Sequence, residues 1–199
     1  MKRIFRIIEI IFDFVIANTL GRIFYSSKYL KGKYFSKVNS LGWKWVTRGI
    51  LFQKILGYNR EVPWPVSEKN YVGNYKNIKF DTEDLHIFQV FGDYYQAWNE
   101  KIIIGKGCYI APNVGIITSN HDLYDLNKRG KAKKVILGEE CWVGMNTTIL
   151  PGVELGKHVI VGAGSVVTKS FKEGNCIIAG NPATIIKKLN KEEINKNEN

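Results

Sequence analysis

The sequence is poor in cysteine and in long uninterrupted apolar runs. Its 199 residues include only 3 Cys, which are far apart and form no C-x-x-C pair: Cys108, Cys141 and Cys176. This odd, sparse set argues against a disulfide framework and a cysteine-based metal site, and is typical of reduced cytoplasmic thiols. The first apolar stretch is interrupted by Glu9 and Asp13, and no small-residue cleavage site follows. We therefore expect neither a cleaved signal nor a membrane span here.

Acidic residues are scarce near the start of the chain. Residues 1–60 hold 12 Lys/Arg against 2 Asp/Glu, whereas the remaining residues hold 17 against 16. An excess of this kind indicates an anionic partner, such as lipid headgroups or nucleic acid, or else a solvated basic face. No zinc-finger, ribonucleoprotein or helix-turn-helix pattern is present. We therefore expect no nucleic acid partner.

Two helices are predicted in this basic region. On a helical wheel of the first helix, four charged residues fall on one narrow stripe: Lys2, Arg6, Glu9 and Asp13. The other residues up to residue 16 are nearly all Ile, Phe and Val. An apolar face this wide packs on the protein, packs on a neighbouring subunit, or lies in a membrane interface. A second helix is predicted over 41–56, followed by Gly57 and two prolines. The chain thus divides into a basic amphipathic helical extension, 1–60, a main domain, 61–189, and a polar tail, 190–199.

From residue 104 the sequence follows a six-residue period. The lead positions are all branched aliphatics: Ile104, Ile110, Ile116, Leu137, Val143, Ile149, Leu155, Val161 and Val167. The next residue is often Gly or Ala, which suits unusual backbone angles or a close approach. Three such hexads make one coil of a three-sided parallel β-helix, with the leads stacked inside. The fold predicted is mainly β, and Asn181 with Pro182 predicts a capped turn into a short C-terminal helix.

The period breaks between Ile116 and Leu137. The spacing of these two leads corresponds to three hexads plus three extra positions, with a polar and basic loop extruded at 122–134. His121 stands at the base of this loop. Loops on a rigid scaffold are common places for chemistry.

Several segments resemble the hexapeptide-repeat acyltransferases. They are "IGKGCYIAPNVGIITSNHD", "VILGEECWVGMNTTILPGVELGKHVIVGAGSVVTKSF" and "AGNPATIIKKL", and they are similar to the branch of maltose, galactoside and nodulation-factor O-acetyltransferases. The stretches "VPWPV", "FGDYYQ" and "TSNHDLYDL" are closer to the acetyltransferases of surface-polysaccharide clusters. The resemblance covers roughly 63–189. It implies a homotrimer with a left-handed β-helix, acetyl-CoA in the groove between neighbouring subunits, and no metal.

The resemblance also implies roles for individual residues. His121 matches the catalytic histidine, and Trp142 matches the tryptophan that lines the cofactor groove. Further matches to positions that hold or shape the CoA site are Met145 (through its backbone), Gly162, Ala163, Gly164, Thr168 and Lys169. Family members often place arginines near the CoA phosphates, where this chain has Thr184 and Lys187. Lys187 is expected to act there as a point charge, without a bidentate grip.

The implied chemistry needs a base for a sugar hydroxyl. An imidazole, with an ordinary pKa of about 6.5, can take the hydroxyl proton as the oxygen attacks a thioester. The oxyanion then accepts from a backbone N–H near Gly144 or Met145. Either a carboxylate, Asp122 or Asp125, or a backbone carbonyl would orient the imidazole. Candidate acceptor contacts are Tyr95, Gln96, Asn99, Asn120 and Asp122.

The function predicted is acetyl-CoA-dependent O-acetylation of a sugar hydroxyl, in a cell-surface polysaccharide or its precursor. The reaction is placed in the cytoplasm, with residues 1–20 suited to peripheral contact with the inner face of the membrane. An N-acetyltransferase for a nucleotide-linked amino sugar and a non-catalytic β-helix scaffold remain open. A γ-type carbonic anhydrase shares the β-helix but needs a zinc histidine at the position where Leu126 stands.

Overall fold

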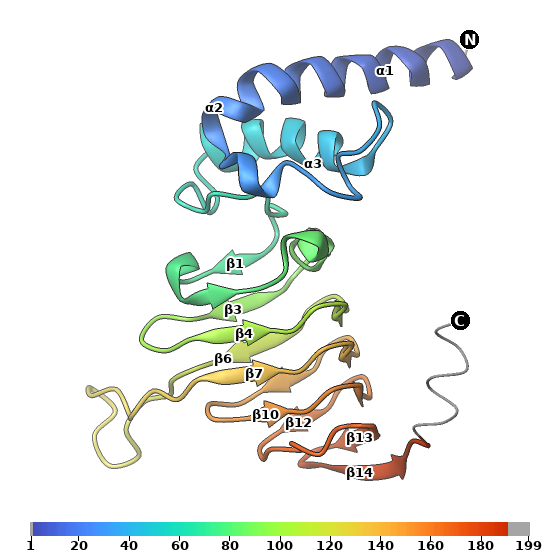
Figure 1. The fold of residues 1–199 in the computed structure, drawn as a ribbon. Helices are drawn as coiled ribbons and strands as arrows, with labels where there is room; N and C mark the ends of the chain where they lie inside the picture. The colour runs from blue at the N-terminus through green and yellow to red at the C-terminus, as the bar shows by residue number, and fades with distance from the viewer. Residues whose placement is uncertain (1, 191–199) are drawn as a thin grey trace.

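A computed structural model describes residues 2–190, with helices at one end and a column of short strands below them (Figure 1). The N-terminal helical elements are α1 (Lys2–Ile16), the π-helical η1 (Ala17–Gly21), α2 (Arg22–Phe24), η2 (Ser27–Tyr29), α3 (Leu41–Gly49) and the π-helical η3 (Ile50–Ile55). Both helices predicted for the basic region are therefore confirmed. Within the described part of the chain, no helix has the length and apolar character needed to cross a membrane. The boundary at residue 60 stays a prediction.

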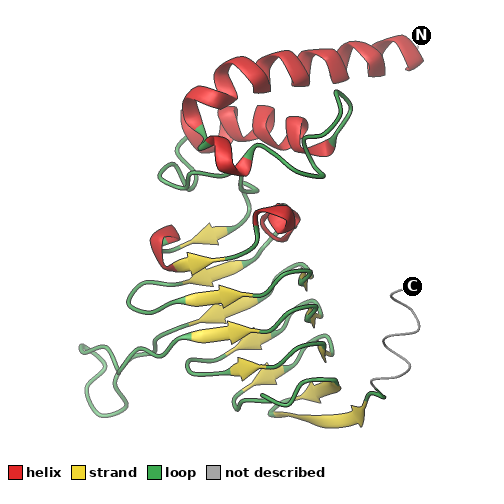
Figure 2. Cartoon of the chain, viewed as in Figure 1, coloured by secondary structure: helices red, strands yellow, loops and turns green. Residues whose placement is uncertain are grey.

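The strands form three sheets, which Figure 2 shows as stacked yellow arrows. Sheet A contains β1 (Tyr71–Val72), β3 (Tyr94–Gln96), β6 (Gly115–Ile117), β9 (Thr148–Ile149) and β12 (Val166–Val167). Sheet B contains β2 (Ile78–Lys79), β4 (Ile102–Ile104), β7 (Val135–Leu137) and β10 (Glu154–Leu155). Sheet C contains β5 (Tyr109–Ile110), β8 (Trp142–Val143), β11 (Val159–Val161), β13 (Cys176–Gly180) and β14 (Ala183–Lys188). Two short 3₁₀ helices, η4 (Tyr75–Asn77) and η5 (Thr82–Phe88), join the first strands.

The six-residue period sets the register of the column. The chain visits the sheets in turn, so that Val143 pairs with Val161, and Ile149 with Val167, each one coil of three hexads later. All nine lead aliphatics are 4% exposed or less. Each coil thus contributes inward-facing side chains to one continuous apolar core, and the predicted parallel coil of hexads is confirmed.

The small residues after the leads are required by close stacking. A Cβ on Gly144 would lie 2.6 Å from the backbone nitrogen of Ala163 in the next coil, and one on Gly138 would lie 2.5 Å from the carbonyl carbon of Gly156. Real Cβ atoms do not approach backbone this closely. Neither Gly138 nor Gly144 has a positive φ, so close approach, rather than an unusual backbone angle, explains both.

The break in the period is longer than the sequence suggested. Ile116 pairs with Ile149, so a single coil takes up the whole of 116–149, whereas the uninterrupted coil from Ile149 to Val167 takes three hexads. The coil that contains the break is therefore longer than a regular coil by nearly three hexads. None of these additional residues forms a hexad of the column. Reading the spacing as three hexads plus three extra positions was wrong, because β6 in sheet A leads directly to β7 in sheet B.

The predicted C-terminal helix is also wrong. Residues 183–188 form β14, which pairs antiparallel with β13 and closes that edge of sheet C. The unpaired backbone groups of a terminal strand favour such an addition, and consecutive β-branched residues, Thr184 to Ile186, suit a strand. Of the predicted polar tail, 190–199, all but residue 190 lies outside the described residues.

One buried carboxyl group lies inside the upper coils. Asp93 is 1% exposed, and its Oδ1 accepts a hydrogen bond from Val114 N at 2.9 Å. Its Oδ2 lies 3.1 Å from the Tyr95 hydroxyl, which is also 2.7 Å from the Ile87 carbonyl oxygen. A single hydroxyl proton serves one acceptor at a time, so a protonated Asp93 can donate to Tyr95 while Tyr95 donates to Ile87. Burial raises the pKa of Asp93 to about 7, although the hydrogen bonds from Val114 and Tyr95 act to lower this pKa.

We expect Asp93 to make folding stability depend on pH. The unfolded carboxyl ionises near 3.8 and the folded one near 7, so its stabilising contribution is complete below about pH 4 and is lost as pH rises through about 7. Asp93→Asn should remove this loss, which is at most on the order of 4 kcal/mol. Urea unfolding across this pH range measures the difference. Glu61→Gln, at an exposed position, should behave as wild type; equal slopes for all three proteins would contradict the assignment.

Candidate functional site

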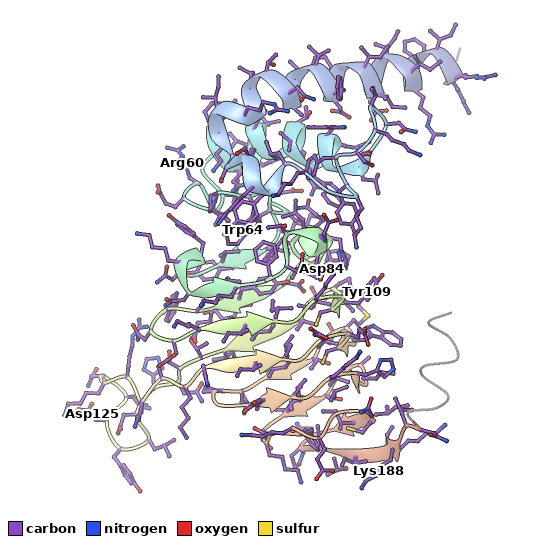
Figure 3. All side chains as sticks on the ribbon, viewed as in Figure 1. Arg60, Trp64, Asp84, Tyr109, Asp125 and Lys188 are labelled. Carbon is purple, nitrogen blue, oxygen red and sulfur yellow. The ribbon has the colours of Figure 1, made fainter. Side chains whose placement is uncertain are left out.

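The extruded loop leaves the column between β6 and β7, where sheet A turns into sheet B (Figure 1). We call this edge the A/B corner. Backbone hydrogen bonds close the loop at its base: Gly130 N donates to Asn120 O at 2.9 Å, and Lys133 N donates to Thr118 O at 2.8 Å. Figure 3 labels Asp125 on the loop, well outside the column. The loop is thus a folded projection with a fixed base.

His121 lies at that base with its imidazole exposed to solvent. Its Nδ1 is 2.7 Å from the carbonyl oxygen of Leu126. A carbonyl can only accept, so Nδ1 donates to it, and in the neutral imidazole the lone pair is on Nε2. The backbone of His121 forms an isolated antiparallel β-bridge with that of Arg129.

The two nearby carboxylates do not orient the imidazole. Asp122 Oδ1 accepts from the backbone N–H groups of Tyr124 and Asp125. Asp125 accepts from Asn127 N and pairs with Lys128 at 3.1 Å. Of the alternatives open at the sequence level, the backbone carbonyl is the one found. Asp122 therefore shapes the loop, and its Oδ1 is already engaged.

Gln96 lies in β3, one coil above the segment that leads into His121. Its side-chain oxygen accepts from Thr118 N at 3.1 Å, Ser119 N at 3.0 Å and Ser119 Oγ at 3.3 Å. These three residues are buried. The prediction that Gln96 contacts a substrate is corrected, because its side chain anchors the chain that leads into His121.

Tyr95 is likewise not a contact residue. It is 1% exposed, and its ring packs against Phe88 inside the column. The alternation of a strand explains this placement, because Tyr95 is the inward residue of β3 in register with Ile116. The aromatic-rich stretch was correctly located near His121, but this tyrosine points to the core.

The exposed candidates gather at the A/B corner. Asn99 follows β3, one coil above His121, and Asn120 precedes the histidine; both are exposed. At the same corner the Arg129 guanidinium lies 4.4 Å from the centre of the Trp98 ring. The sequence analysis missed Arg129, because nothing in the sequence of a basic loop indicates which of its Lys and Arg side chains contacts the column. This stack ties the loop to the preceding coil.

The residues matched to a cofactor site gather at a different edge. Met145 follows β8 and Gly162 to Gly164 follow β11, both where sheet C turns into sheet A. At this C/A corner, Gly164 N donates to Met145 O at 2.8 Å, so the two turns stack directly. Ala163 is exposed beside them, and the Trp142 ring projects from the outer face of sheet C, 54% exposed.

The three remaining residues predicted for the cofactor site lie elsewhere. Thr168 and Lys169 follow β12 and are exposed at the A/B corner, two coils below His121. Lys187 is exposed on β14, at the terminal edge of sheet C. Within one chain, sheet A separates His121 from Trp142 and the C/A corner. His121, Thr168 and Lys169 thus lie at one corner and Met145 with Gly162 to Gly164 at another, and one chain does not join the two.

The site has the chemistry of a single base. Its tautomer is set, its free nitrogen faces solvent, and the three cysteines are buried in the column. Among residues 2–190, no group of His, Cys, Asp and Glu is arranged to hold a metal ion. His121 can therefore take a proton from a hydroxyl or amine presented at the A/B corner.

The coils match a known protein family, and several known proteins are similar in sequence to part of this chain. The profile of the family described as "Bacterial transferase hexapeptide (six repeats)" matches residues 134–169. The "Galactoside O-acetyltransferase" of Lactococcus lactis subsp. lactis (strain IL1403) is 40% identical over 92 residues, or 45% of this chain and 44% of that protein. "Putative lipopolysaccharide biosynthesis O-acetyl transferase WbbJ" of Escherichia coli (strain K12) is 38% identical over 47% of this chain and 53% of that protein.

A third relative is matched over more of its length. The "Probable macrolide acetyltransferase" of Lysinibacillus sphaericus is 36% identical over 121 residues, or 50% of this chain and 67% of that protein. For the other two, the chain spans about half the length of the curated relatives it matches. Each of the three matches covers half of this chain or less.

We expect the Gln96 side chain to fix the backbone segment that leads into His121. Gln96→Ala leaves the buried Ser119 N–H without its acceptor, whereas Thr118 N still donates to the Gln96 backbone oxygen at 3.2 Å. Amide hydrogen exchange at Ser119 should therefore accelerate by about tenfold or more, and exchange at Thr118 should change less. Gln96→Glu keeps the acceptor oxygen and should restore most of the protection. Asn99→Ala, exposed at the same corner, serves as the matched control. Unchanged exchange in Gln96→Ala would show that the anchor is unimportant.

Proposed function

Because the chain belongs to the hexapeptide-repeat transferases, we propose that it transfers an acetyl group from acetyl-CoA to a sugar hydroxyl. The observation that carries the proposal is the His121 imidazole, exposed at a rigid corner with Nδ1 bound to the Leu126 carbonyl at 2.7 Å. Two relatives are named as O-acetyltransferases, one for galactosides and one for lipopolysaccharide biosynthesis. These names support oxygen as the acceptor atom and a cell-surface glycan or its precursor as the substrate.

The reaction uses one base and no covalent enzyme intermediate. His121 Nε2 takes the proton of the hydroxyl while its oxygen bonds to the thioester carbon. The carbonyl oxygen becomes an oxyanion and accepts from a backbone N–H. The C–S bond then breaks, the ester forms, and the imidazolium returns its proton to the leaving CoA sulfur. The hydrogen bond to Leu126 holds the imidazole in the required tautomer throughout.

The cofactor site requires a second subunit. In one chain, His121 lies at the A/B corner, whereas Trp142, Met145 and Gly162–Gly164 lie at or beside the C/A corner. Packing the A/B corner of one chain against the C/A corner of the next would join them, which supports an assembly of several copies with acetyl-CoA between neighbours. The assembly proposed is a homotrimer of left-handed coils. Trp142 would pack on the CoA arm, and Thr168, Lys169 and Lys187 would contact its polar and charged groups.

The acceptor would bind above the histidine at the A/B corner. The Arg129 guanidinium is stacked on the Trp98 ring there, and Asn99 and Asn120 are exposed beside the stack. Planar groups suit the apolar face of a sugar ring, and amides suit its hydroxyls. Tyr95 and Gln96 take no part in this contact, because both are buried.

Removing the base should abolish turnover without abolishing donor binding. We expect His121→Ala to lower kcat by about 10²-fold or more, because general base catalysis contributes at least that much, while the Kd for acetyl-CoA stays within about twofold. Thiol release from acetyl-CoA measures the rate, with mono- and oligosaccharides and a nucleotide-linked amino sugar as acceptors.

The outcomes separate the competing functions. Turnover with hydroxyl acceptors supports O-acetylation, whereas turnover with the amino sugar alone indicates an N-acetyltransferase. An absence of acetyl-CoA binding would indicate a scaffold. Asn127→Ala, in the same loop and with no role in the proposed reaction, is the matched control. Full activity of His121→Ala would remove the histidine from the mechanism.

Trp142 should act on the donor rather than on the chemistry. We expect Trp142→Ala to raise the KM for acetyl-CoA by about tenfold, since aromatic stacking contributes about 1 kcal/mol beyond the lost buried area, with little change in kcat. Tyr109→Ala is the matched control, because Tyr109 pairs with Trp142 in sheet C and is similarly exposed. Equal KM values for wild type and Trp142→Ala would contradict this donor groove.

A further inference from the structure

Helix α1 turns its charged stripe toward the protein. Glu9 pairs with Lys44 of α3 at 2.6 Å, and Asp13 on the same stripe is half-buried. Beside this stripe, the Phe14 ring packs edge-on against Trp43, with centroids 5.3 Å apart. The helix is therefore docked through its polar side and one flank, which is the reverse of an ordinary surface helix.

The opposite side of α1 is an apolar face directed at solvent. Its residues are 49% to 68% exposed, and no charged residue lies among them on the helical wheel: Ile4, Phe5, Ile7, Ile8, Ile11, Phe12 and Val15. Exposed apolar residues continue the face through η1 and α2: Leu20, Ile23 and Phe24. We call this set the outer apolar face. Soluble proteins seldom expose so long a contiguous apolar surface without a partner for it.

The helix lies across the end of the column. In Figure 1 it runs above α3, at the opposite end of the molecule from β14, and it extends beyond the coils beneath it. Since α3 covers the inner side of α1, the outer apolar face points away from the column. The extruded loop projects from the side of the column, several coils away (Figure 3). A flat partner could therefore cover the face without covering His121.

Charge identifies the partner. Arg3 and Arg22 are exposed on the same helical segment and lie outside the charged stripe, and residues 1–60 hold 12 Lys/Arg against 2 Asp/Glu. A second copy of this chain would bring two such basic regions together, which is unfavourable. A bilayer with anionic phospholipids offers apolar depth for Ile and Phe and phosphates for Lys and Arg.

We propose that the outer apolar face of α1 and α2 lies in the interface of an anionic phospholipid bilayer, parallel to its surface. The proposal is independent of the reaction assigned to His121. Apolar side chains enter the boundary between headgroups and acyl chains, and the polar stripe stays against α3. The column then stands away from the membrane with its A/B corner open to the side.

Vesicle binding of the full chain tests the contact. Wild-type protein should sediment with vesicles of phosphatidylcholine mixed with phosphatidylglycerol, and bind pure phosphatidylcholine at least tenfold more weakly. Ile8→Glu and Phe12→Glu should each lower binding to mixed vesicles by about tenfold or more, because each places a charge in the buried face. Arg22→Gln should lower it by about fivefold, the effect of one basic residue at an anionic surface.

The matched controls lie on the column. Phe91→Glu changes a 50% exposed phenylalanine away from α1, and Lys106→Gln removes an exposed lysine from a turn before β5. Both should bind mixed vesicles as wild type does. Light scattering without lipid tests for a second copy: a smaller oligomer in Phe12→Glu, with no vesicle binding by wild type, would overturn the proposal.

A conservative variant gives a positive readout that does not depend on weakened folding. Phe12→Trp keeps the apolar face and adds a fluorophore, so vesicles with brominated acyl chains should quench it more than they quench wild type. Phe91→Trp should show no added quenching. Equal quenching of Phe12→Trp and wild type would overturn the proposal.

Discussion

The stacking of one coil on the next, three hexads later, is the constraint on which the rest of the structure depends. Inward aliphatics such as Ile149 and Val167 form the apolar core, and each coil's backbone hydrogen bonds go to its neighbours. Because adjacent turns nearly touch at Gly144 and Ala163, a larger residue at such a turn would force the coils apart. The column therefore tolerates insertions only at corners, and the long insertion at 122–134 lies at the A/B corner.

The insertion uses the rigidity of the column for its own order. Gln96, fixed in β3, accepts hydrogen bonds from the amides of Thr118 and Ser119, and the Arg129–Trp98 stack returns the loop to the coil above. The Leu126 carbonyl then sets the imidazole tautomer. Each contact joins the loop to itself or to a coil, so the His121 imidazole is held in place by the chain itself. The general-base role proposed for it requires preorganisation of this kind.

The two ends of the column are covered in different ways. At the C-terminal edge, β14 covers the last parallel strand with an antiparallel one, so that the backbone of β13 is paired. At the other end, α3 lies between α1 and the first coils, and the two helices join through the Glu9–Lys44 ion pair and the Phe14–Trp43 ring contact, while the opposite, apolar side of α1 remains outward. A helix docked by its charged stripe leaves its apolar side for a separate partner, and the basic composition of residues 1–60 suits an anionic one.

The sequence by itself determined the column, the two N-terminal helices, the place of the loop and the candidate histidine. It could do so because a six-residue period with aliphatic leads, and a helical wheel with one charged stripe, are local patterns that reflect burial directly. Tertiary structure alone decided the rest. Which residues of β3 face inward, which acceptor orients His121, and whether residues 183–188 continue as a helix or pair with β13 all depend on groups distant in sequence. The side of α1 that docks was decided the same way, because Lys44 and Trp43 of α3, rather than the periodicity of the helix, select its inner face.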